Sequence, residues 1–198
     1  MATLTFPSLI RPGPSYIAWS LQSLTLAHMS PLSGAVRTLS TLGARWRFVS
    51  TWASLEGTDR HVMEAFLGAL NGRAGRFYFS PPEWVVPKGT ARTGVVNGGS
   101  QTGSVLNVTL VAGATFKAGD FFEVNNELKR ITANVTADGA GAASLAFTPP
   151  LRASPTGGAS LVLTAPRAAF MLIDDEVGVT VTTGGRADVT IDAIEAFP

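Results

Sequence analysis

The sequence has no cysteine and little charge, and both absences narrow the possible functions. Without cysteine, disulfide bonds and thiolate metal sites are excluded. Charged residues make up only 15% of the 198 residues and the formal net charge is +1, whereas globular proteins average roughly 25% charged residues. This composition argues against a broad polyanion-binding surface and is compatible with a surface that partner subunits cover in part.

Long hydrophobic runs are also absent. No apolar stretch approaches the roughly 20 residues that a membrane-spanning helix needs. The first 15 residues are interrupted by Pro7, Pro12 and Pro14 and do not follow a signal-peptide pattern. We therefore expect a soluble protein that is made in the cytoplasm and has no membrane segment.

The side chains that usually carry catalysis are sparse. The only histidines are His28, in a serine-rich segment, and His61, in the first turn of a predicted helix. Two isolated histidines do not make a zinc site, and neither lies in the setting of a catalytic triad. The carboxylates of residues 174–176 are consecutive and converge only in a turn, so a solvated hairpin tip is favoured over a cation site. We expect no enzyme activity, no metal and no cofactor.

A single convincing helix is predicted over residues 58–71. Thr58 or Asp59 is placed to cap its start, and Gly72 to end it in the left-handed conformation. Apolar residues recur at three- and four-residue spacing and predict one buried stripe: Val62, Met63, Phe66, Leu67 and Leu70.

Aromatic strands flank this helix on both sides. Before it, alternation predicts that Trp46, Phe48 and Trp52 share a buried face while Arg45, Arg47 and Thr51 face outward. After it, Phe77 and Phe79 alternate with Tyr78, and Pro81 and Pro82 end the strand. The flanking strands and the helix predict a sheet with the helix on one side.

Residues 88–164 differ in composition, because they contain no Trp or Tyr and consist of short apolar runs between glycine-rich turns. Turns are predicted at Asn97-Gly98, at residues 118–120, at Asn125-Asn126 and at Asp138-Gly139, the last of them as a hairpin turn. Five strands at this spacing predict a small barrel or sandwich: 105–111, 120–124, 127–133, 143–147 and 159–163.

The ends of the chain are expected to form one domain around this module. Longer alternating strands return after residue 165, with a turn at Gly184-Gly185. The predicted organisation is a discontinuous domain of residues 1–87 and 165–198, interrupted by the inserted accessory module 88–164. The proline-rich residues 1–34 fit either an arm lying over the body of its own or a neighbouring subunit, or a pair of short edge strands.

Basic residues gather around the helix and its flanking strands. They have three open interpretations: a channel for DNA, contacts to acidic residues of a neighbouring subunit, or unpaired surface charge. The residues are Arg45, Arg47, Arg60, Arg73 and Arg76.

The order of these segments resembles the distal tail proteins of long-tailed bacteriophages. The resemblance rests on the strand ending at Trp52, the helix closing with residues 66–72, the strand of residues 75–80, and the later segments 117–131, 147–152 and 165–172. It covers most of residues 36–197. It implies a mainly β, tail-tube-like sandwich flanked by one helix, with an accessory β domain.

The resemblance also implies partners. Six copies are expected to close a ring at the distal end of a phage tail, stacked on the tail tube protein and on hub or baseplate proteins. A tape-measure protein is a further expected contact, and DNA is expected only as cargo passing through the lumen. The expected location is the virion tail tip, after assembly in the host cytoplasm.

Two alternatives follow from the same residues. A tail tube or tail terminator protein shares the fold, although the inserted module favours the distal position. A carbohydrate- or receptor-binding tail protein would need an aromatic ligand face, and in the inserted module only Phe116, Phe121, Phe122 and Phe147 are candidates.

The expected ring contact lies on the outward face of the helix and beside it. Our candidate interface residues are Asp59, Arg60, Glu64, Arg73 and Arg76, with Arg45 and Arg47 on the neighbouring strand.

Overall fold

The computed structural model describes residues 3–7, 10, 13–40, 43–81, 85–182 and 184–197, and divides into two compact units. Unit 1 comprises residues 1–20, 46–79 and 168–198, and unit 2 comprises residues 21–45 and 80–167. The predicted insertion, 88–164, lies inside unit 2, which also contains residues 21–45. Pro82, the predicted end of a strand, lies outside the described residues.

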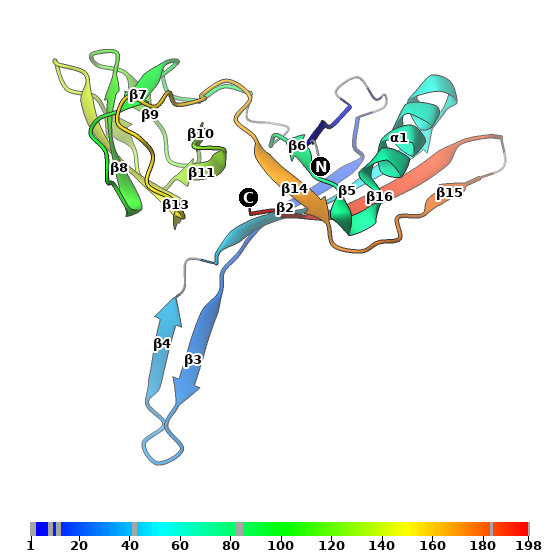
Figure 1. Ribbon diagram of the computed structural model, residues 1–198, viewed down its shortest axis with the longest axis horizontal. Helices are drawn as coiled ribbons and strands as arrows, with labels where there is room; N and C mark the ends of the chain where they lie inside the picture. Colours follow the sequence, from blue (N-terminus) through cyan, green and yellow to red (C-terminus); the bar gives the residue numbers. More distant parts are fainter. Residues whose placement is uncertain are drawn as a thin grey trace. The chain divides into compact units, whose positions relative to one another are not determined.

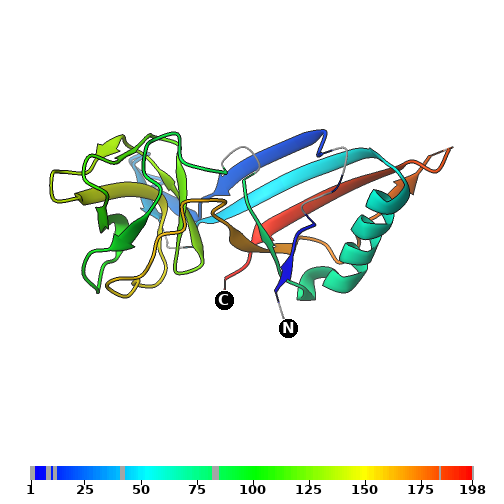
Figure 2. The same cartoon turned by 90° about the horizontal axis from the view of Figure 1, so that it is seen from above.

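Unit 1 is built on one seven-stranded sheet with a single helix on one face (Figures 1 and 2). Its strand order is β1-β6-β14-β16-β5-β2, and β15 pairs with β16 beyond the end of β14. Strand β1 pairs in parallel with β6, whereas β14 pairs antiparallel with β6 and β16, and β16 pairs antiparallel with β5 and β15. The strands are β1 (Leu4–Thr5), β2 (Tyr16–Gln22), β5 (Arg45–Leu55), β6 (Phe77–Phe79), β14 (Ala168–Leu172), β15 (Val179–Val181) and β16 (Ala187–Glu195).

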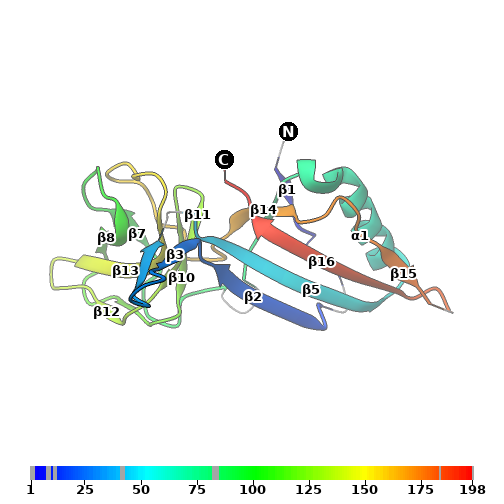
Figure 3. The same cartoon turned by 90° about the horizontal axis from the view of Figure 1, so that it is seen from below.

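Strand β5 confirms the predicted alternation. Trp46, Phe48 and Trp52 are buried, while Arg45 and Arg47 face the other side of the sheet. Figure 3 shows β5 running beside β16 and β2 along the length of the sheet. The long, alternating strand makes one face of the sheet apolar, and this face receives the helix.

Helix α1 (Gly57–Leu70) packs its apolar stripe on the sheet through Met63, Phe66 and Leu70, which are buried. Val62 is 40% exposed and Leu67 is only partly buried, so the predicted stripe is wider than the buried one. Capping also differs from expectation: the N-cap is Glu56, without a side-chain cap hydrogen bond, and Asn71 takes the left-handed conformation after the last helical residue. Asn tolerates that conformation well enough to end a helix one residue before Gly72.

The N-terminal segment is integral to unit 1. Leu4–Thr5 adds a parallel strand beside β6, and the Phe6 ring lies 5.3 Å from Trp52 and 5.1 Å from both Phe66 and Phe79. Of the two interpretations of residues 1–34, the edge strands are therefore correct for β1 and β2. Phe6 ties the start of the chain to both the helix and the sheet.

Unit 2 contains a curved five-stranded sheet around its own core. The strand order is β10-β11-β13-β8-β7. Strands β9 and β12 pair with each other in a separate two-stranded sheet. Asn125 and Asn126 both have positive φ, as a tight hairpin turn between β10 and β11 requires. The strands are β7 (Gly94–Val96), β8 (Gly103–Leu110), β9 (Thr115–Phe116), β10 (Phe121–Val124), β11 (Glu127–Ile131), β12 (Val135–Thr136) and β13 (Ala142–Leu151).

The predicted fifth strand of this module, residues 159–163, forms bridges instead of a regular strand. Ser160 bridges to Val95 of β7, and Val162 bridges to Glu123 of β10. These bridges join both edge strands of the sheet to one segment, so the module behaves as the predicted small barrel and protects its own edges.

The remaining element is a two-stranded ribbon, β3 (Thr25–Met29) with β4 (Val36–Ser40). Figure 1 shows it as a hairpin closed by a turn, and Gly34 in that turn has a φ of +66°. A mainly β chain with one flanking helix is thus confirmed. In the described residues, no helix is both long and apolar enough to cross a membrane.

Candidate functional site

The β3–β4 ribbon carries the densest group of exposed apolar side chains in the described chain. Every residue of β3 is exposed, although an isolated two-stranded hairpin is at best marginally stable in water. The ribbon and its turn expose five large apolar residues: Leu26 (63%), Met29 (65%), Leu32 (98%), Val36 (59%) and Leu39 (63%). Leu24, immediately before β3, is 54% exposed.

The pairing register sorts these residues onto two faces. Leu26 lies opposite Leu39 and His28 lies opposite Arg37, so these four side chains share one face, which we call the cationic face. The other face carries Ala27 opposite Thr38 and Met29 opposite Val36. The cationic face therefore combines two leucines with two basic side chains and has no acidic residue of its own.

Sequence reasoning missed this ribbon, although a signal for it was present. Residues 12–36 contain no Asp, Glu, Lys or Arg, and the first acidic residue of the chain is Glu56. Edge strand β2 belongs to the same uncharged stretch, and among the described strands only β5 pairs with it. Monomeric proteins commonly protect such edges with charge, proline or bulges. An uncharged edge followed by an apolar ribbon is typical of a surface that another chain covers.

The predicted interface residues fall on two opposite faces of the unit 1 sheet. Arg47 lies on the face away from α1, where its guanidinium forms an ion pair with Asp192 at 2.5 Å. The hydrogen bond from Arg47 to the Asp192 carboxylate raises the pKa of Arg47 above its usual value. By strand alternation Arg45 shares this face. These two arginines are thus separated by the sheet from the candidates on the helix.

The candidates on and after the helix have local structural partners. Arg60 donates to Glu64 at 2.8 Å, one turn along α1. Arg76 donates from one guanidinium nitrogen to the carbonyls of Arg73, Ala74 and Gly75, which ends the short 3-10 helix η1 (Gly72–Ala74). Asp59 lies in the first turn, where a negative charge is favourable.

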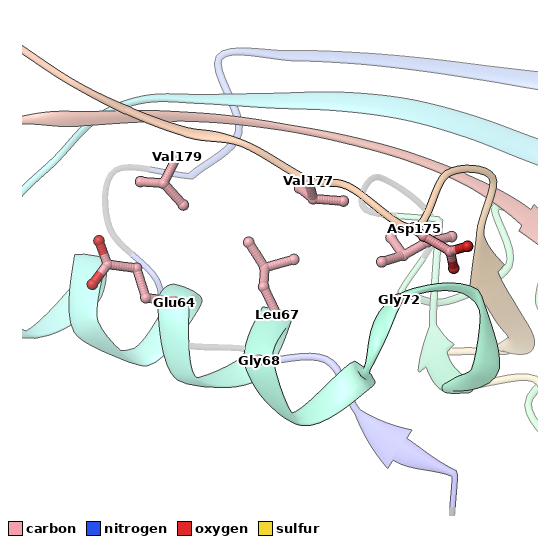
Figure 4. A pocket seen from close by; sticks show the side chains of 8 residues that line it. Glu64, Leu67, Gly68, Gly72, Asp175, Val177 and Val179 are labelled. Carbon is pink, nitrogen blue, oxygen red and sulfur yellow. The ribbon is translucent and has the colours of Figure 1, made fainter.

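A groove runs along this side of unit 1, between α1 and the segment that links β14 to β15. It has a volume of about 270 Å³, and Figure 4 shows Leu67 facing Val177 and Val179 across it, with Glu64 and Asp175 toward its two ends. Asp175 also accepts a hydrogen bond from the backbone N–H of Arg73 at 2.9 Å, which fixes the linking segment against η1. Both charged side chains that line the groove are acidic.

The phenylalanines proposed as a ligand face are core residues. Phe116 and Phe122 are fully buried, and Phe121 and Phe147 are 4% and 2% exposed. Phe122 packs edge-to-face on Phe147 with ring centroids 5.5 Å apart. The prediction of a sugar-stacking face on these rings is wrong, because in this module they supply the apolar interior that Trp and Tyr supply elsewhere.

The buried charges of unit 2 are structural. Lys129 is fully buried and donates to Glu127 at 2.6 Å and to the carbonyl of Pro150 at 2.8 Å. Burial raises the pKa of Glu123, whose carboxylate accepts from the backbone N–H of Arg167. In the part of the chain that the structure describes, no group of three or more His, Asp or Glu side chains is arranged to hold a metal ion. Residues 174–176 are exposed, as a solvated turn predicts.

Comparisons with known proteins leave these surfaces as the main guide to function. No protein-family model matches the sequence, and a search of curated proteins finds no significant match.

Proposed function

We propose that this chain is a structural subunit that functions by assembling with copies of itself into a ring, as in the tail tip of a long-tailed bacteriophage. The observation that supports this most directly is the β3–β4 ribbon, which with its turn leaves five large apolar side chains in water. A two-stranded ribbon with this composition gains stability when a neighbouring chain covers it. If the neighbouring chain is a second copy, burial of these side chains holds the two copies together.

The proposed contact is one that generates a ring and not a two-fold dimer. In it the ribbon of one copy packs on a different part of the next copy, so the contact is head-to-tail. Head-to-tail contacts that close generate cyclic assemblies. In the proposed function six copies form the ring, with the tail tube protein on one side and hub or baseplate proteins on the other.

The inserted module fits an accessory role in this proposal. Its sheet edges are joined through residues 159–163 and its aromatic rings are internal, so it does not offer strand edges for pairing with neighbours. The open edge strand β2 and the apolar β3–β4 ribbon are consecutive in the sequence and belong to two different sheets. We therefore place the assembly contacts on β2, on the ribbon and on unit 1.

The experiment is a direct measurement of assembly. Size-exclusion chromatography with light scattering on the full chain should give a mass near six subunits, and negative-stain images should show rings. Purified tail tubes mixed with the protein should carry it at one end. A protein that stays monomeric over the whole accessible concentration range would contradict the proposal, and binding along the full length of the tube would contradict the distal position.

A further inference from the structure

The groove between α1 and the β14–β15 link is the surface of unit 1 that best complements the ribbon. Resting on the proposed function, we propose that the cationic face of the ribbon of one copy docks into this groove on a second copy. The occupant is thus a second copy of this chain, and the two contacting surfaces are different parts of it. Charge, apolar content and accessibility support this pairing.

The charges are complementary. The two charged side chains that line the groove are Glu64 and Asp175, and the exposed residues Asp174 and Glu176 flank the latter. The ribbon offers His28 and Arg37 side by side on one face, and no acidic residue precedes Glu56 in the chain. Bringing the ribbon to the groove pairs charges of opposite sign, whereas ribbon against ribbon would bring like charges together.

The groove and the cationic face of the ribbon both expose aliphatic side chains. The groove wall contains Leu67, Val177 and Val179, all partly exposed in the single chain. The leucines at positions 26 and 39 lie next to the basic pair on the cationic face. Docking therefore removes leucine side chains from water at the place where the groove exposes its own apolar lining.

A cysteine crosslinking experiment tests the contact. The natural chain has no cysteine, so two introduced thiols react without background from native thiols. Gly68 lines the groove on exposed helix surface, and a Cβ added there meets nothing within 4 Å, so Gly68→Cys is expected to fold. Leu39→Cys places the second thiol on the cationic face, and Thr38→Cys places it on the opposite face of the same strand as a matched control.

The single-cysteine chains are mixed and treated with a short bis-maleimide crosslinker. We expect the Leu39→Cys and Gly68→Cys mixture to give several-fold more crosslinked dimer than the Thr38→Cys and Gly68→Cys mixture, after subtracting each variant alone. Equal or reversed yields within an intact oligomer would overturn the groove as the docking site while leaving the ring proposal in place. A chain that remains monomeric would overturn the proposed function and this inference with it.

The same chain can also be tested for self-docking. If the mixed variants do not crosslink but the double variant Leu39→Cys/Gly68→Cys crosslinks within one molecule, the groove receives the ribbon of its own chain, and the second-copy proposal is overturned.

A charge swap gives an independent readout. Arg37→Glu should weaken assembly several-fold, because it places a carboxylate against Glu64 of the neighbouring copy. Adding Glu64→Lys to the same chain should restore much of the loss, since the pair is again of opposite sign. Failure of the second change to restore assembly, with both chains folded by circular dichroism, would contradict the proposed pairing.

Discussion

Replacing Leu26 and Leu39 together by serine is the sharpest test of the ribbon's role. Both side chains are 63% exposed in the single chain, so the substitutions remove apolar surface that the proposed contact between copies would bury. Full burial of a leucine stabilises by about 1.5–3 kcal/mol. For two leucines that are each about two-thirds exposed, the loss is about 2–4 kcal/mol per ribbon.

This loss predicts a measurable change in assembly. At 1.4 kcal/mol per factor of ten, the dissociation constant of the ribbon contact should rise by about 30-fold or more. Mass photometry over a dilution series measures the concentration at which the oligomer falls apart. The midpoint of thermal unfolding of the monomer should stay nearly unchanged, because neither leucine belongs to a core.

The matched control lies in unit 2. Val105 and Val162 are 51% and 41% exposed, and replacing both by serine removes a similar kind of surface from the accessory module. This control should assemble like the unmodified chain. If the Leu26→Ser/Leu39→Ser variant dissociates at the same concentration as the control, the ribbon does not carry the assembly and our reasoning is refuted.

Three further predictions concern stability. Asp120 is fully buried and accepts hydrogen bonds from the backbone N–H groups of Lys88, Gly89 and Lys117. Each N–H group left without its acceptor costs about 1–3 kcal/mol, so Asp120→Ala should lower the free energy of unfolding by at least about 3 kcal/mol in a urea titration. A loss below about 1 kcal/mol would contradict this role of Asp120. Phe6→Ala should cost about 2–4 kcal/mol in the same assay through the aromatic contacts it removes, and an unchanged midpoint would show that the N-terminal segment does not anchor to the core. Burial raises the folded-state pKa of Glu123 above its usual value, so its contribution to stability is fully present below the unfolded pKa and is lost as pH rises through the folded pKa. Glu123→Gln should flatten this decline with pH, and a steeper decline would contradict the prediction.

Local patterns in the sequence were enough to predict the helix of unit 1 and the aromatic strands that flank it. The alternation of Trp46, Phe48 and Trp52 predicts one buried strand face, and the spacing of Met63, Phe66 and Leu70 predicts the helix face that packs on it. Both patterns report which side of an element is apolar, and this depends only on neighbours in the chain. The turn at Asn125-Asn126 is predictable for the same reason, because it depends on which residues tolerate positive φ.

Only the tertiary structure decided which residues meet across long separations. Arg47 pairs with Asp192 on the sheet face opposite the helix, and Asp120 binds backbone groups more than 30 positions earlier in the chain at Lys88 and Gly89. No local pattern encodes such pairings, because they depend on strand order and register.

In the β3–β4 ribbon, too, the sequence determines one property and the tertiary structure another. The uncharged run from residue 12 to residue 36 is visible in the sequence, and it indicates a stretch that tolerates no water-facing charge. The run does not show whether its apolar residues are covered by the same chain. The phenylalanines of the inserted module are as apolar as the leucines of the ribbon, yet they are buried while the leucines are exposed. Hydrophobicity alone determines that a side chain favours burial, and the fold determines which side chains the chain itself can bury and which remain for a neighbour.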